Sequence, residues 1–295
     1  MTSIGISVAG EGRGAWRLAP LLAALALSLA AMVASLGPAA AAGEDGRPCP
    51  FARSDLPKVS ALPTLAKGLA SRRPLRIVAI GSSSTEGIGA SSRVRAYPAQ
   101  LESDLRRTWP GARIEVANAG IGGETVEQTL VRLARIVNDA AKPDLLLWQV
   151  GTNDAVKGGD PARFRSQLEE GVATARAAQV PVVLIDQQYF PKIDDVARYE
   201  RYVGIVGSVA QANGLPVLSR YRLMHGWAAS DPALYAAMLS GDGFHMSDQG
   251  YACLARTLAA TITAAVGAVQ VGSAPAPAEH GALETPRGIV LSMRP

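Results

Sequence analysis

From residue 75 onward, short runs of apolar and β-branched residues alternate with longer stretches of helical periodicity. The short runs are LRIVAIG, ARIEVANAG, DLLLWQVG, VPVVLIDQ and the weaker LPVLS. The longer stretches predict helices over residues 97–109, 125–138, 161–179, 196–213 and 248–266. Strands and helices that alternate at this spacing are joined by right-handed crossovers between parallel strands. The pattern therefore predicts an α/β fold, a three-layer α/β/α sandwich around a five-stranded parallel sheet.

The segment before this pattern has a different character. Arg13 and Arg17 precede an Ala/Leu-rich run over residues 18–36, and the small residues of AAAA end at Ala42. This order is typical of a signal peptide, so we expect cleavage near Ala42 and an exported protein, periplasmic or extracellular. The run also approaches the roughly 20 apolar residues that span a bilayer. An uncleaved N-terminal anchor is therefore the alternative, and membrane contact is expected only in that case.

The chain divides by composition into four predicted segments. The C-terminal segment, GSAPAPAEHGALETPRGIVLSMRP and the few residues before it, is rich in Pro, Ala and Gly and has no sustained period, which is typical of disorder. The predicted segments are a leader over 1–42, an extended lead-in over 43–74, a folded domain over 75–268 and a mostly disordered tail over 269–295.

Composition and charge exclude some classes of partner. The chain is 48% hydrophobic and 18% charged, as globular proteins are. Its net charge is +4, and its blocks of basic residues are no longer than the pairs Arg72-Arg73 and Arg106-Arg107. A solvated surface explains charges this sparse, so we expect no nucleic-acid partner.

The chain has two cysteines, Cys49 and Cys253. Export would place both in an oxidising compartment, where a disulfide between them would close a loop of about 200 residues and contribute about 5 kcal/mol in the chain-entropy model. One buried and one exposed thiol is the alternative, and the sequence does not decide between the two.

Polar and glycine-rich segments follow the first three predicted strands and precede the last predicted helix. They are GSSSTEG, NAGIGGET, GTNDA and SGDGFHMSDQGY. In a parallel open sheet the carboxyl ends of the strands meet at one edge, and ligands bind there. We therefore expect these four segments to form one site.

Together the four segments resemble the SGNH subgroup of the GDSL hydrolases, and the resemblance covers most of residues 75–266. It implies a flavodoxin-like SGNH hydrolase fold with strand order 2-1-3-4-5. It also implies site residues: Ser83 as nucleophile, His245 and Asp242 as its partners, and an oxyanion hole built from Ser83, Gly123 and Asn153. The sequence departs from the family pattern at Ser82, where the family has aspartate, and this leaves open what supports the nucleophile turn.

The same residues make chemical sense by themselves. A serine hydroxyl needs an imidazole to take its proton, and the imidazole needs a carboxylate to fix its tautomer. Of the three histidines, His245 has Asp242 three residues before it in a glycine-containing loop, whereas His280 lies in the tail. We expect His225 to be structural or to line a pocket. Gly123 allows close backbone approach and Asn153 supplies an amide donor, which suits an oxyanion hole.

Neighbouring residues have predicted supporting roles. Ser82 is expected to turn back and hydrogen-bond the surrounding loops, while Ser84 and Thr85 cap the helix that begins there. Asp154 is expected to anchor its loop as a structural acid. Pocket lining and ordinary packing are both open for three aromatic residues, Tyr189, Phe190 and Trp227.

The function predicted is that of an exported serine ester hydrolase that forms an acyl-enzyme on O-acyl groups, above all O-acetyl groups, of a glycan or envelope polysaccharide. A lysophospholipase or acyl thioesterase of the same fold is the alternative, so the substrate is an acylated small molecule, glycan or lipid. Two other readings remain: a flavodoxin-like module that cradles a flavin phosphate on SSSTEG, which would not need DGFH, and an inactive envelope protein on a hydrolase scaffold. The chain has no HExxH, CxxC or Walker motif, so no metal or cofactor is expected.

Overall fold

The computed structural model describes residues 49–51, 56 and 62–272 of the chain. The predicted leader over 1–42 and nearly all of the predicted tail lie outside the described residues. The sheet has the order β2-β1-β3-β4-β5, and every neighbouring pair is parallel, which confirms the predicted fold. The strands are β1 (Leu75–Gly81), β2 (Ile114–Gly120), β3 (Leu145–Gln149), β4 (Val182–Ile185) and β5 (Val217–Leu218).

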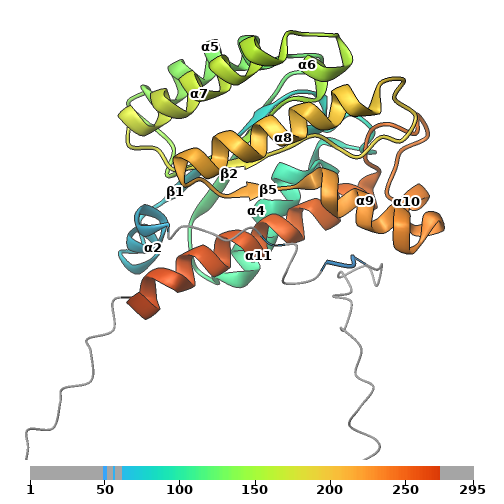
Figure 1. Cartoon of the computed structure of the whole chain (residues 1–295). Helices are drawn as coiled ribbons and strands as arrows, with labels where there is room; N and C mark the ends of the chain where they lie inside the picture. Colours follow the sequence, from blue (N-terminus) through green and yellow to red (C-terminus); the bar gives the residue numbers. More distant parts are fainter. Residues whose placement is uncertain (1–48, 52–55, 57–61, 273–295) are drawn as a thin grey trace, which may run out of the picture. The chain divides into compact units, whose positions relative to one another are not determined.

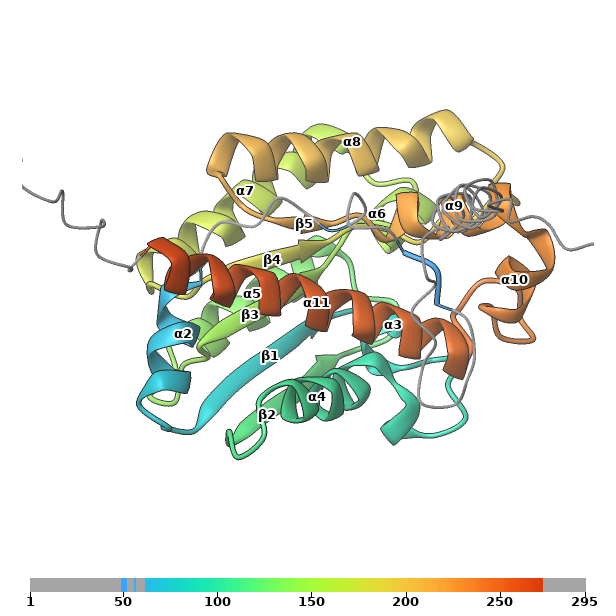
Figure 2. The same cartoon turned by 90° about the horizontal axis from the view of Figure 1, so that it is seen from below.

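Helices cover both faces of the sheet (Figure 1). On one face lie α5 (Val126–Val137), α7 (Pro161–Ala177) and α8 (Val196–Asn213). On the other lie α2 (Pro63–Ala70), α4 (Tyr97–Thr108) and α11 (Asp248–Gly272), which Figure 2 shows in front of the sheet. Because side chains alternate along a strand, β1 contributes to both layers: Val78 and Ile80 pack under the first group of helices, and Ile77 and Ala79 under the second.

The long helices were predicted to within a few residues at most ends, but short helices were not predicted. The prediction of an extended lead-in is wrong over residues 63–70. Pro63 begins α2 there, and Leu65 of that helix is buried in the core. The boundary predicted after residue 268 also falls inside α11, which continues to Gly272. The remaining short helices are α3 (Ser83–Glu86), the 3₁₀ helix η2 (Arg93–Arg95), α6 (Thr152–Val156), α9 (Arg220–Ser230) and α10 (Pro232–Ala237).

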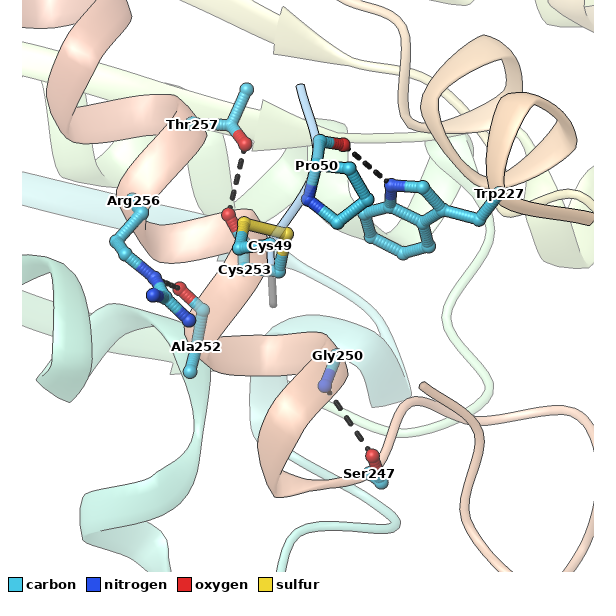
Figure 3. Close-up of a disulfide and its surroundings, with 9 residues drawn as sticks. All are labelled: Cys49, Pro50, Trp227, Ser247, Gly250, Ala252, Cys253, Arg256 and Thr257. Atoms are coloured by element: carbon cyan, nitrogen blue, oxygen red, sulfur yellow. Dashed lines mark hydrogen bonds between the residues drawn. A yellow bond between two sulfur atoms is a disulfide. The ribbon is translucent and has the colours of Figure 1, made fainter. Parts of the chain in front are cut away.

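A disulfide joins the start of the described chain to the last helix. Cys49 and Cys253 are fully buried, their Cα atoms are 5.2 Å apart, and their sulfur atoms are bonded (Figure 3). Next to it, the indole Nε1 of Trp227 in α9 donates a hydrogen bond of 2.8 Å to the carbonyl oxygen of Pro50. The segment 49–51 is therefore fixed to both α11 and α9. Within the described residues, none of the helices combines the length and apolar character needed to cross a membrane.

Candidate active site

The four polar segments meet at the carboxyl edge of the sheet, as the sequence predicted. Ser83 is the first residue of α3, directly after β1. Its Oγ lies 2.9 Å from Nε2 of His245, a residue of the loop before α11. On the other side of the ring, Nδ1 of His245 lies 2.6 Å from Oδ2 of Asp242. A hydroxyl, an imidazole and a carboxylate thus form one hydrogen-bonded line, which can move a proton from the hydroxyl to the ring.

The loop that carries Asp242 and His245 is organised by the aspartate itself. Oδ1 of Asp242 accepts hydrogen bonds from the backbone N–H groups of Phe244 and His245, both at 2.9 Å, and from the hydroxyl of Ser240 at 2.7 Å. Burial alone would raise the pKa of Asp242, but the hydrogen bonds from His245, Phe244 and Ser240 outweigh it and hold this pKa below its usual range. The carboxylate therefore stays ionised and fixes the orientation of the ring.

The turn that carries Ser83 rests on β3. Both the backbone N–H and the hydroxyl of Ser82 donate to Oε1 of Gln149, at 2.9 and 3.1 Å. The hydroxyl of Thr85 donates to the same oxygen at 3.3 Å and lies 3.3 Å from the hydroxyl of Tyr97. Ser82 therefore turns back as predicted, but toward β3 and not toward the loops. The predicted capping role is wrong, because α3 has no side-chain cap and the hydroxyl of Thr85 is directed at β3.

Gly123 has a backbone φ of +78°, a conformation that only glycine adopts readily. Its carbonyl oxygen accepts a hydrogen bond of 2.6 Å from Nζ of Lys157. The residue before it is fixed as well, since the N–H of Gly122 donates to Oε2 of Glu86 at 2.7 Å. The loop after β2 is thus held from α3 on one side and from the end of α6 on the other.

Asn153, in α6, holds this same loop. Its Nδ2 donates a hydrogen bond of 2.8 Å to the carbonyl oxygen of Glu124. A side-chain amide carries two N–H donors, so this bond leaves a second donor on Asn153. An amide beside a glycine loop and a helix N-terminus can stabilise a negatively charged oxygen.

Asp154 is buried next to Asn153, and its two carboxyl oxygens accept from the N–H of Val126 at 3.1 and 3.2 Å. Burial raises the pKa of Asp154 to about 6, although the hydrogen bond from Val126 and the charge of Lys157 act to lower it. It ties α6 to the start of α5, in agreement with the structural role predicted for it.

A fully buried arginine contacts the start of α6, which carries Asn153. The guanidinium of Arg220 donates to Oε1 of Gln188 at 2.7 Å and to Oγ1 of Thr152 at 3.4 Å, and Thr152 also donates to Gln188 at 3.1 Å. Burial lowers the pKa of Arg220. This network supports the residue directly before Asn153.

An open groove of about 530 Å³ lies beside the histidine. Its lining includes Phe190 and Phe244, whose ring centres are 4.9 Å apart, and the ring of Phe244 is 5.0 Å from that of His245. The remaining lining residues come from α6 and the turn after it, the segment between β4 and α8, and α8 itself: Ala155, Val156, Gly158, Lys192, Ile193, Asp194, Asp195 and Arg198. The lining contains apolar side chains and charged side chains of both signs.

The other aromatic candidates have different places. Trp227 is buried in the core, and Tyr189 packs against the same core and against His225, with ring centres 4.9 Å apart. His225 is exposed, and its ring contacts are with tyrosines. Among the described residues, no group of three or more His, Cys, Asp and Glu side chains could hold a metal ion.

Residues 48–268 match the Non-GDSL lipase-like family. The chain belongs to this family. Its name agrees with the serine that stands at position 82 in place of the aspartate of GDSL sequences. The match covers the sheet, both helical layers and all the site residues described above.

Several curated proteins and solved structures resemble parts of the chain. An uncharacterized lipoprotein, YqeF of Bacillus subtilis, is 34% identical over 116 residues, 37% of this chain and 46% of that protein. Esterase TesA of Pseudomonas aeruginosa is 29% identical over 135 residues, 45% of this chain and 64% of that protein. The solved structure of a lipase/acylhydrolase from Enterococcus faecalis superposes with a TM-score of 0.55 at 26% identity, over 64% of this chain and 96% of that one.

The sequence analysis did not predict three residues that support the candidate site. Glu86 stands in the segment GSSSTEG, and Gln149 ends a buried apolar strand, where a lone polar residue is a usable signal. Arg220 begins a helix after β5 and has no local feature that indicates burial. The sequence-predicted residues Ser83, His245 and Asp242 are in direct contact, and Gly123 and Asn153 lie in the adjoining loop and helix.

Proposed function

We propose that the protein is an exported serine ester hydrolase that acts through an acyl-enzyme. The observation that carries the proposal is the hydrogen-bonded line from Ser83 Oγ through His245 to Asp242, with distances of 2.9 and 2.6 Å. A flavin-phosphate cradle on the same segment is less well supported, because that ligand would not need an imidazole and a carboxylate aligned on the serine.

The proposed reaction has two halves. His245 Nε2 takes the proton of Ser83 as Oγ attacks the ester carbonyl carbon, and Asp242 stabilises the imidazolium that forms. The tetrahedral intermediate then releases its alcohol, which takes the proton back from His245, and leaves an ester between the acyl group and Ser83. In the second half a water molecule, deprotonated by His245, attacks the acyl carbon of this ester; the bond to Ser83 Oγ then breaks, Oγ takes the proton back from His245, and the carboxylic acid is released.

The negative oxygen of the tetrahedral intermediate needs donors that are already in place. We assign this role to the backbone N–H groups of Ser83 and Gly123 and to the amide of Asn153. Support comes from contacts to the residues before two of the donors: Glu86 binds the N–H of Gly122, and Arg220 binds the hydroxyl of Thr152. Donors held in this way need little rearrangement as the charge develops.

The substrate class proposed is an O-acyl group, above all O-acetyl, on a glycan or envelope polysaccharide in the periplasm or outside the cell. Export is supported by the leader pattern over 1–42, by the Cys49–Cys253 disulfide and by the lipoprotein among the relatives. The apolar groove favours a second candidate, a lysophospholipase or acyl thioesterase, because Phe190 and Phe244 offer contact to an acyl chain longer than acetyl.

The test has two steps. Fluorophosphonate labelling followed by peptide mapping should modify Ser83, and Ser83→Ala should abolish both labelling and turnover. Rates on p-nitrophenyl esters of increasing chain length, followed by acetate release from acetylated glycans, then separate the two substrate classes. Labelling of Ser82 or Ser84, or full activity of Ser83→Ala, would overturn the proposal.

A further inference from the structure

The side-chain oxygen of Gln149 is a shared acceptor at the base of the nucleophile turn. Gln149 is the last residue of β3 and is 2% exposed. Its Oε1 accepts three hydrogen bonds, two from Ser82 and one from Thr85, so it contacts the residue before Ser83 and the residue two positions after it. One oxygen of the central sheet thereby holds both sides of the turn.

The packing around Gln149 makes the position of its amide well defined. β1 and β3 are neighbours, with Ile80 opposite Trp148 as the last pair before the turn. Gly81 gives the amide its space, because a Cβ at this position would lie 2.7 Å from Oε1 of Gln149 and 2.4 Å from Oγ1 of Thr85. The glycine at the start of the nucleophile segment is therefore explained by the close approach of this amide.

The network continues into the layer formed by α4. The hydroxyl of Tyr97 lies 3.3 Å from Oγ1 of Thr85. Since Thr85 donates its proton to Gln149, Tyr97 is the donor in that contact. A chain of hydrogen bonds thus runs from a fully buried tyrosine through the turn to the sheet, and all its members are buried.

We propose that Gln149 is the positioning residue of the nucleophile turn, and that with Ser82 it supplies the support that GDSL sequences place at their aspartate. Gln149 acts through its neighbours, since it holds Ser82 and Thr85 and thereby the place of Ser83 Oγ relative to His245 Nε2. The inference rests on the proposed function, because it concerns the alignment of a serine nucleophile. Displacing a reacting group by about 1 Å costs roughly 100-fold in rate, so a small shift of the turn is measurable.

The test compares Gln149→Met, which keeps the length of the side chain and removes the acceptor, with Thr129→Val. Thr129 is a matched control because it is also buried near Gln149, and its hydroxyl bonds the indole N–H of Trp148 at 3.2 Å and the carbonyl oxygen of Val126 at 3.0 Å instead of residues of the turn. For Gln149→Met we expect kcat to fall about 10- to 100-fold with KM changed by less than about 3-fold. The rate of fluorophosphonate labelling of Ser83 should fall in parallel. Thr129→Val should keep both rates within about 2-fold of wild type at a comparable melting temperature.

A double-mutant cycle separates positioning from general destabilisation. The hydroxyl of Ser82 donates its hydrogen bond to Gln149. Ser82→Ala should therefore lower kcat in the wild-type background, but it should lower kcat little further in the Gln149→Met background. Additive losses in the cycle would overturn the inference, and so would wild-type labelling and turnover in Gln149→Met, or equal losses in Thr129→Val. The proposed function fails separately, namely if wild-type protein is not labelled on Ser83.

Discussion

Asp154 gives the fold a pH dependence that can be measured without any substrate. Its carboxyl group is buried between α6 and α5, and burial raises its pKa from 3.8 to about 6. The native protein therefore keeps a proton on Asp154 up to about pH 6, whereas the unfolded chain releases it near pH 3.8. Between these values the native state binds more protons, so the free energy of unfolding falls as the pH rises.

The size of this effect follows from the two pKa values. A change from 3.8 to about 6 corresponds to about 3 kcal/mol, which is fully lost above about pH 6. Asp154→Asn keeps an oxygen acceptor for the N–H of Val126 and removes the ionisation. Relative to wild type, the variant should gain up to about 3 kcal/mol of stability between pH 4 and pH 7.

The assay is urea unfolding at 25 °C, followed by circular dichroism at closely spaced pH values with the disulfide intact. A second buried carboxyl group, Asp186, also has its pKa raised by burial to about 6, but it is present in both proteins and cancels in the difference. A difference that is constant with pH would refute the reasoning. A difference of opposite slope would mean that the N–H of Val126 and the ammonium of Lys157 outweigh burial.

Three further perturbations have expected outcomes. Asn153→Ala should lower kcat roughly 10²- to 10³-fold with a smaller change in KM, and an unchanged kcat would remove this residue from the oxyanion hole. Asp242→Asn should lower kcat about 10⁴-fold with native circular dichroism, whereas equal activity would mean that His245 works without this acid. Replacing Cys49 and Cys253 by serine should lower the free energy of unfolding by up to about 5 kcal/mol, given their separation of 204 residues, and unchanged urea midpoints would contradict it.

The sheet and its long helices could be predicted because their signals are local. β1 was predicted with its observed ends, since LRIVAIG is apolar except for Arg76 and stops at a glycine. The helix α2 was not predicted, because its eight residues become stable through the packing of Leu65 and Leu62 against the core. Short helices of this kind depend on contacts that sequence periodicity does not contain.

The residues of the candidate site likewise fall into those that local sequence signals predict and those that depend on distant contacts. Ser83, Asp242 and His245 could be named because each stands in a segment with a recognisable spacing, and the parallel topology brings the segments to one edge. Their chemical roles stay predictions until the variants are assayed. Gln149 was missed because its importance comes from Ser82, 67 residues away in the chain, and the intervening residues give no sign of the pairing.

The distance in sequence between Ser83 and His245, 162 residues, has a consequence for the timing of activity. A ribosome adds about 5 to 20 residues per second, so the serine is made roughly 8 to 30 s before the histidine. All five strands are complete once Leu218 has been added, and a chain of that length still lacks Asp242 and His245. On the proposed roles, a growing polypeptide that ends before Asp242 and His245 has no means to activate Ser83, so we expect ester hydrolysis only from chains that include the loop before α11.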